Sequence, residues 1–325
     1  MMTSALDLLR RGRPGARIAV LARPEARSLL SGNPVVDELV IYPYKSGSPF
    51  HGLAELRRRI KAGRHDVFLS LDRRPRGAAA AFIAGIPRRI GPDILFAGAG
   101  PKLWTRLLFN QTVTMSPDEC RGSLVEMFQL VVRRAFGLEG RGRISLPPVD
   151  EARARWARGL LAEARGPVVG LCVRTNDPGK TWPAEGFAAL ARRLKYDFNA
   201  FIYVTGSPAD RPYVEALAQA VRPLELLNLA GRTELMDINA LAAQSDLCVA
   251  LDNGAAHLMA NSPLKRLLCL LMATTPAILM DSMPRARFIS FPPPPPGQAA
   301  TLGPGQVETV YQAAAELLRQ APPAV

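Results

Sequence analysis

The strongest constraint on the fold is a repeated alternation of short apolar runs with helix-like segments. In the first half, runs of the kind found in buried strands occupy residues 17–22, 38–42 and 66–71. We expect a further short strand at residues 88–91 and helices at 4–11, 53–60, 78–86 and 119–137. Alternation of this kind predicts βαβ units and a parallel sheet.

The alternation restarts in the second half, behind a stretch rich in Gly, Arg and Pro at residues 138–150. We therefore predict two domains, 1–145 and 146–325. The strands expected in the second are 168–173, 200–205, 225–228 and 247–251, with helices at 151–165, 184–194, 210–220 and 237–244. A doubly wound α/β sheet follows, with ligands expected at the carboxyl ends of its strands. A last amphipathic helix, 306–319, closes the chain, and packing back on the first domain is one placement open to it.

Composition narrows the kinds of partner. The 325 residues are 48% hydrophobic and 21% charged, with a formal net charge of +13 that comes mainly from short arginine clusters such as Arg57, Arg58 and Arg59. A solvated, arginine-rich surface is the simplest explanation, and attraction to a phosphorylated substrate or an acidic membrane face is the alternative. No aromatic residues alternate with these clusters in a stacking pattern, so nucleic acid is not an expected partner.

Cysteine usage and the apolar runs predict a cytoplasmic protein. The four cysteines lie far apart without a CxxC pair, and neither they nor the three histidines show ligand spacing, so we expect reduced core thiols and no metal or cofactor. Asp7, Arg10 and Arg11 interrupt any signal-peptide-like stretch. The longest apolar run, 267–280, is too short to span a bilayer.

The first candidate site is the segment VRTNDPGKTWP, residues 173–183. A strand end leads into a polar, glycine-containing loop, and Pro183 suits the first turn of the helix that follows. The loop offers backbone N–H groups, the hydroxyls of Thr175 and Thr181, and the Lys180 ammonium at a helix N-terminus, which together predict an anion site. The alternative is an ordinary turn with a surface lysine.

The second candidate site is DLCVALDNGAAHLMA, residues 246–260, where an apolar strand runs directly into Asp-Asn-Gly and a helix. Asp252 is expected to cap that helix, and Gly254 allows close approach of a ligand to the backbone. His257 is either part of the site or a satisfied core residue. Because both segments follow strands of one predicted sheet, we expect a shared anion pocket.

These residues resemble glycosyltransferase family 9, the ADP-heptose:lipopolysaccharide heptosyltransferases. GKTWPAEGFAALARRL and NLAGRTELMDINALAAQSDLCVALDNGAAHLMA contain a K-x-W-P loop, an L-A-G-x-T stretch and a D-x-G-x-x-H loop in the order and spacing of that family. The likeness extends more weakly into the first half of the chain. It implies a GT-B fold, in which two Rossmann-like domains face a cleft and the C-terminal domain binds the donor.

The resemblance also implies a reaction and a site. The reaction is metal-independent, inverting transfer of a heptose from an ADP-sugar to a lipopolysaccharide-core acceptor at the cytoplasmic membrane face. Lys180 and Thr175 would hold donor phosphate, and Asp252 would contact the sugar. The implied phosphate loop and its support are Asn253, Gly254, Ala255 and His257. Acceptor contacts would come from the N-terminal domain, and our own hypothesis for its phosphate contacts is Lys102, Arg106 or the cluster of Arg73, Arg74 and Arg76.

Two departures from the family pattern bear on activity. Family members begin with a strand and a Gly-Asp loop whose aspartate is taken as the general base. No aspartate in residues 1–12 lies in such a loop and Asp7 is expected in mid-helix, so no catalytic base is assigned. The first domain is then expected to lack its first strand, which leaves two neighbouring strands with an unpaired edge. After the second site, NSPLKRLLCLLMATTPA stands in place of the expected G-T-P and F-G-x-T-x-P pieces.

Three interpretations follow from these departures. The chain is an active transferase as written, or a transferase whose sequence is recorded from a downstream start codon. The third interpretation is a decayed member of the family that binds nucleotide sugars or partner proteins without turnover. Turnover would separate the last from the first. A Rossmann-type dehydrogenase is disfavoured, because no G-x-G-x-x-G follows any expected strand.

Overall fold

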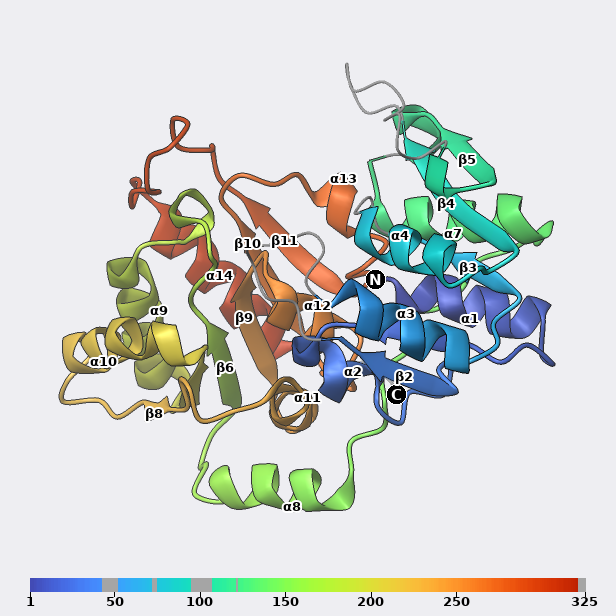
Figure 1. Cartoon of the computed structure of the whole chain (residues 1–325). Helices are drawn as coiled ribbons and strands as arrows, with labels where there is room; N and C mark the ends of the chain where they lie inside the picture. The colour runs from blue at the N-terminus through green and yellow to red at the C-terminus, as the bar shows by residue number, and fades with distance from the viewer. Residues whose placement is uncertain (43–51, 72–74, 95–106, 121, 321–325) are drawn as a thin grey trace. The chain divides into compact units, whose positions relative to one another are not determined.

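The computed structural model describes residues 1–42, 52–71, 75–94, 107–120 and 122–320 (Figure 1). The chain divides into two compact units, Met1–Pro147 and Pro148–Val325, each with its own sheet structure. We describe the units separately. None of the helices in the described residues is both long and apolar enough to cross a lipid bilayer.

The strands of the first unit form two small parallel sheets. β1 (Ala19–Ala22) pairs with β2 (Glu38–Ile41), and β3 (Val67–Leu69), β4 (Arg88–Ile94) and β5 (Gln111–Met115) form the second sheet in that order. Sequence analysis missed β5. Within the described ranges β1 pairs only with β2 and β3 only with β4.

Helices cover these strands. They are α1 (Thr3–Gly12), the 3-10 turn η1 (Pro24–Ala26), α2 (Arg27–Leu30), α3 (Leu53–Ala62), α4 (Pro75–Ile83), α6 (Pro117–Cys120) and α7 (Leu124–Phe136). The single helix predicted over 119–137 was wrong, because Ser123 accepts a hydrogen bond from the amide of Glu126 and starts a new helix there. Gly137, with φ of +63°, ends α7 as predicted.

The second unit contains one six-stranded, all-parallel sheet. Its strands are β6 (Val168–Cys172), β7 (Phe201–Thr205), β8 (Leu227–Asn228), β9 (Leu247–Leu251), β10 (Leu267–Leu271) and β11 (Ala286–Ser290), in the spatial order β11-β10-β9-β6-β7-β8. Sequence analysis predicted no strand at β10 or β11. Every residue of β10 is buried, and an apolar run buried on both faces has no alternation that separates strand from helix.

Helices cover both faces of this sheet (Figure 1). The elements are α8 (Glu151–Leu160), α9 (Ala184–Phe198), α10 (Arg211–Ala220), α11 (Leu235–Ala243), α12 (Gly254–Ala260), α13 (Pro276–Leu279) and α14 (Gln306–Arg319), with 3-10 turns η2 (Pro178–Lys180) and η3 (Pro208–Asp210). α9, α10 and α14 form one core cluster with those strand residues that point to one face of the sheet. α8 and α11 form another cluster with strand residues that point to the opposite face. α14 contacts α9 and β9.

Candidate functional site

The sheet of the second unit reverses its strand order at β6. From β6 the chain adds β7 and β8 on one side and β9, β10 and β11 on the other, so β6 and β9 are neighbours although 75 residues separate Cys172 from Leu247 in the sequence. The loops after β6 and β9 therefore leave the same edge of the sheet at its switch point. In open parallel sheets this is where ligands bind.

The loop after β6 is shaped by its own polar side chains. The Thr175 hydroxyl donates to the carbonyl of Asp177 (2.7 Å) and accepts from the Asp177 amide (3.1 Å). The Asp177 carboxylate accepts a hydrogen bond from the amide of Gly179 (2.9 Å) and so caps the 3-10 turn η2. Lys180 is the last residue of that turn. Thr175 thus has a structural task in the loop besides the phosphate contact implied by the resemblance.

Trp182 fixes this loop to the core. Its side chain is 0% exposed, its ring meets Phe187 edge to face at 4.9 Å, and its Nε1 donates to Oε1 of Gln306 in α14 at 3.0 Å. Pro183 is the N-cap of α9 rather than a residue of its first turn, a small correction to the sequence prediction. A buried indole two residues after Lys180 restricts where the lysine can reach.

Asn253, and not Asp252, caps the helix after β9. The Asn253 Oδ1 accepts from the amide of Ala256 (2.9 Å), and its Nδ2 donates to the carbonyl of Arg174 (2.9 Å), which ties the two loops together. The predicted cap at Asp252 was therefore wrong. Since Asn253 satisfies the helix end, the Asp252 carboxylate is left for other partners.

Three groups converge on the Asp252 carboxylate, whose side chain is 13% exposed. Lys180 Nζ lies 3.5 Å from Oδ2, the Thr274 hydroxyl donates to Oδ2 at 2.7 Å, and His257 Nε2 lies 3.7 Å from Oδ1. The structure thus brings Lys180, Asp252 and His257 together. Thr274 was not predicted from the sequence, because it follows β10, which was not predicted either. The signal for Thr274 was the T-x-P within ATTP, which remains from the expected F-G-x-T-x-P piece.

His257 is a largely buried histidine, with its side chain 17% exposed. Burial lowers its pKa from 6.5, and the attraction of Asp252 opposes that shift only in part. Among the described residues its buried Nδ1 has no hydrogen-bond partner. The imidazole is therefore neutral near pH 7 and can support the loop without adding a charge.

The lowered pKa of His257 predicts a pH-dependent contribution to stability. The unfolded chain takes up this proton near pH 6.5, but the folded chain takes it up only at lower pH, so stability falls as pH drops through that window. We expect His257→Gln to remove this part of the dependence. Urea unfolding at about pH 8 and about pH 5.5 would measure it, and a constant gap between wild type and variant would contradict it.

Gly254 and Ala255 begin α12, directly after Asn253. A Cβ added to Gly254 would meet no heavy atom within 4 Å, and its φ is not of the left-handed kind that requires glycine. Protein packing thus gives no reason for glycine here, whereas a ligand lying on the backbone would. Ala255 follows in the first turn of α12, half-buried.

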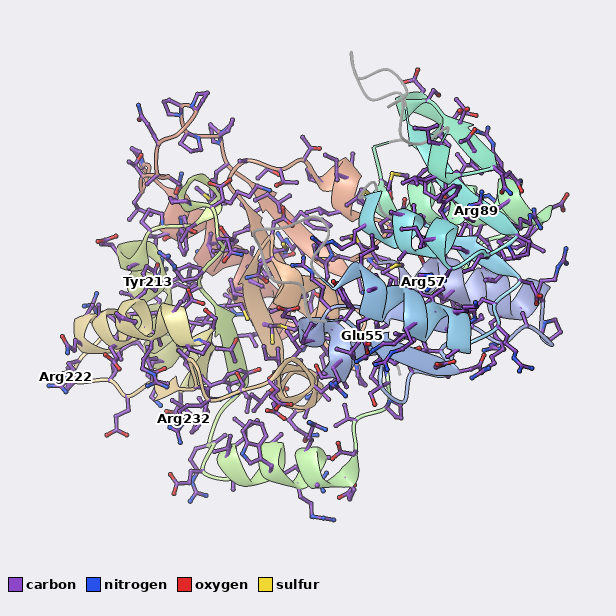
Figure 2. The ribbon with its side chains drawn as sticks, viewed as in Figure 1. Glu55, Arg57, Arg89, Tyr213, Arg222 and Arg232 are labelled. Atoms are coloured by element: carbon purple, nitrogen blue, oxygen red, sulfur yellow. The ribbon has the colours of Figure 1, made fainter. Side chains whose placement is uncertain are left out.

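Arg174 is a second cation at the end of β6, which sequence analysis did not select. Its Nε lies 3.5 Å from Oδ1 of Asp210, and its guanidinium lies over the ring of Tyr213, labelled in Figure 2, at 5.1 Å from the centroid. The cations Lys180 and Arg174 each lie beside a carboxylate at this edge, Asp252 and Asp210, and the neutral imidazole of His257 lies beside Asp252. Within the described ranges no group of three or more His, Cys, Asp or Glu side chains is placed to hold a metal ion.

The predicted acceptor-side residues belong to the first unit. Arg73, Arg74, Lys102 and Arg106 lie outside the described residues, and Arg76 lies in α4. Asp7 lies in α1 as expected, where its carboxylate accepts from the amide of Arg143 (2.7 Å) and pairs with Arg11 (3.0 Å).

The cluster of Arg57 to Arg59 has partners within the first unit. Arg58 and Arg59 pair with Glu55 inside α3, and the Nε of Arg57 donates to the carbonyl of Ile83 (Figure 2). These contacts favour the simpler explanation, a solvated basic surface, for that cluster.

Comparison with known proteins identifies the family of the chain. The model of glycosyltransferase family 9 (heptosyltransferase) matches residues 53–289, more than half of the chain. Lipopolysaccharide heptosyltransferase 2 of Escherichia coli is 27% identical over 270 residues, 77% of this chain and 73% of that protein. Lipooligosaccharide heptosyltransferase 2 of Haemophilus influenzae is 37% identical over 112 residues, 32% of this chain and 31% of that protein.

The structure of the ADP-heptose lipopolysaccharide heptosyltransferase II of E. coli superposes with a TM-score of 0.78 at 23% identity, covering 98% of this chain and 95% of that one. That likeness confirms the predicted α/β fold of GT-B type. The family match confirms the resemblance drawn from the K-x-W-P and D-x-G-x-x-H loops, and makes the chain a transferase. The chain belongs to glycosyltransferase family 9.

Proposed function

We propose that this protein transfers a heptose from an ADP-sugar to a lipopolysaccharide-core acceptor. One observation carries the proposal: at the switch point of the second unit, the loops after β6 and β9 place Lys180 beside Asp252 and the open backbone at Gly254. A cation, a carboxylate and exposed amides suit a sugar diphosphate, which has an anionic half and a hydroxyl-bearing half.

In this proposal each group has one task. Lys180 and the amides at residues 253–255 hold the diphosphate, with Thr175 shaping the loop beneath it. Asp252 accepts hydrogen bonds from sugar hydroxyls, and neutral His257 supports the phosphate loop from behind. The resemblance implies the same roles for Lys180, Asp252, His257 and residues 253–255, and for Thr175 it implies a phosphate contact as well. The meeting of Lys180, Asp252 and His257 at the switch point supports these roles.

The proposed reaction is a single displacement. An acceptor hydroxyl oxygen attacks the anomeric carbon from the side opposite the diphosphate, the bond from that carbon to the diphosphate oxygen breaks, and ADP leaves with the electron pair. The acceptor proton passes to a base that we do not assign. Lys180 and the loop amides would stabilise the charge that develops on the departing diphosphate, so the proposal needs neither metal nor cofactor. The product is inverted at the anomeric carbon.

The acceptor places the proposed reaction at a membrane surface. A lipopolysaccharide core is attached to lipid, so we propose a cytoplasmic protein that works at the inner face of the membrane. The net charge of +13 supports attraction to a phosphorylated acceptor or to acidic lipid. The alternative, a family member that binds donor without turnover, makes the opposite prediction for product formation.

Incubation with ADP-heptose and a heptose-deficient core acceptor tests the function. We expect stoichiometric ADP and glycosylated acceptor, undiminished by EDTA, with the anomeric configuration opposite to that of the donor by NMR. Donor binding without product would favour the non-catalytic alternative. Neither binding nor product would reject the donor assignment, and loss of activity with EDTA would reject the metal-independent mechanism.

A further inference from the structure

The Asp252 carboxylate is held by a residue that the proposed function leaves without a role. The Thr274 hydroxyl donates to Asp252 Oδ2 at 2.7 Å, the usual distance for a hydroxyl that donates to a carboxylate. Thr274 stands three residues after β10, on the β9 side of the switch point, so three neighbouring strands supply this cluster: β6, β9 and β10.

Local structure offers no other use for that hydroxyl. The helix after it, α13, is capped by the next residue, Thr275, whose side chain makes no cap hydrogen bond. Thr274 is half-buried whereas Thr275 is exposed, and the hydrogen bond we observe from the Thr274 hydroxyl is the one to Asp252. The chain thus offers two adjacent threonines, of which one faces the site.

With Thr274 bound to Oδ2, the two carboxylate oxygens of Asp252 have different partners. Oδ2 receives both Thr274 and, at 3.5 Å, Lys180, whereas the partner of Oδ1 in the described part of the chain is the neutral His257 at 3.7 Å. Lys180 is therefore kept short of a close ion pair, for which N–O distances near 2.8 Å are usual. This arrangement leaves the ammonium available to a phosphate and Oδ1 available to a hydroxyl.

We propose that Thr274 is a positioning residue that orients Asp252 toward the sugar of the donor, and so makes the site prefer a sugar diphosphate over the free nucleoside diphosphate. The proposal rests on the proposed function, in which Asp252 meets the sugar and Lys180 the phosphates. It assigns to Thr274 a contribution to sugar binding and none to the nucleotide.

The test compares Thr274→Val, which removes the hydroxyl at nearly constant volume, with Thr274→Ser, which restores it, and with the matched control Thr275→Val. Binding of ADP and of ADP-heptose is measured by calorimetry for all three and for wild type. We expect Thr274→Val to weaken ADP-heptose roughly 10-fold or more and to leave ADP within about twofold, since one hydrogen bond to a charged group is lost. Thr274→Ser and Thr275→Val should match wild type.

Kinetics and a structure make the test decisive. For Thr274→Val we expect a raised donor KM with a smaller change in kcat, and a crystal structure in which the Asp252 carboxylate has left its wild-type orientation. Equal weakening of ADP and ADP-heptose, no weakening of either, or an unmoved Asp252 would overturn the proposal. Wild type that binds ADP-heptose no better than ADP would also overturn it. Wild type that binds neither ligand would instead overturn the proposed function, and this inference with it.

Discussion

Lys180→Ala is expected to abolish most of the stabilisation that ADP-heptose gives to the folded protein. At about 100 times its dissociation constant, a ligand adds roughly 2.7 kcal/mol to the free energy of unfolding. Loss of one charge-assisted hydrogen bond to phosphate costs about 1.5–3 kcal/mol, which raises the dissociation constant about 10-fold to 100-fold. Thermal unfolding with and without ADP-heptose measures the loss.

The unliganded variant should remain folded. Lys180 is 36% exposed, its nearest contact to Asp252 is 3.5 Å, and Asp252 keeps its hydrogen bond from Thr274 when the lysine is gone. A pair at 3.5 Å whose lysine is partly in solvent contributes little to stability. A loss of the ligand shift at an almost unchanged unliganded melting temperature would therefore report on binding alone.

Lys265→Ala is the matched control. Lys265 also pairs with an aspartate, Asp246, at 2.6 Å, but it precedes β10 and its partner precedes β9, so the pair lies at the amino ends of these strands. We expect the full ligand shift in this variant. If Lys180→Ala also kept the full shift, the assignment of Lys180 to donor phosphate would be wrong.

Trp182→Ala is expected to lower the free energy of unfolding of the second unit by about 3–5 kcal/mol, the usual cost of deleting a fully buried aromatic side chain. The indole is 0% exposed, packs on Phe187, and donates to Gln306, whose carbonyl would lose its partner. Urea unfolding followed by circular dichroism measures the change. Since Trp182 anchors the loop of Lys180, weaker donor binding should accompany it.

Trp156→Ala and Trp182→Phe control for this prediction. Trp156 lies on α8 with 36% exposure, and its removal should cost no more than about 1 kcal/mol. Trp182→Phe keeps an aromatic ring but loses the hydrogen bond to Gln306. Its decrease in the free energy of unfolding should therefore lie between the decreases of the two alanine variants. Equal losses for Trp156→Ala and Trp182→Ala would contradict the anchoring role.

Much of this protein could be predicted from local sequence. Short apolar runs predicted β1, β2, β3, β6, β7 and β9 near their observed bounds. The reason is clearest for β6 and β9, since a strand buried along its whole length must be apolar whatever its neighbours. Gly137 predicted a helix end because its left-handed backbone suits glycine. The two loops with Lys180 and Asp252 were found because a strand that passes directly into a polar, glycine-containing turn is itself a local signal.

Other features depended on tertiary structure. β5 has the mixed sequence QTVTM, and β10 is a uniformly apolar run whose type depends on being covered on both faces. Asp252 was predicted as a helix cap, but the choice between Asp252 and Asn253 was made by the bond from Asn253 to Arg174, 79 residues away.

The sequence by itself determined the family, the parallel α/β fold and the two loops of the site, because local patterns indicate each of them. Short apolar runs indicate the strands, and the K-x-W-P and D-x-G-x-x-H motifs indicate the family and the loops. Only the tertiary structure decided that β6 lies beside β9, that Lys180 therefore meets Asp252, and that Thr274 completes the cluster from the end of β10. The physical reason is that strand order follows from burial of the whole sheet, and a hydrogen bond between loops is set by that order rather than by the residues next to it in the chain.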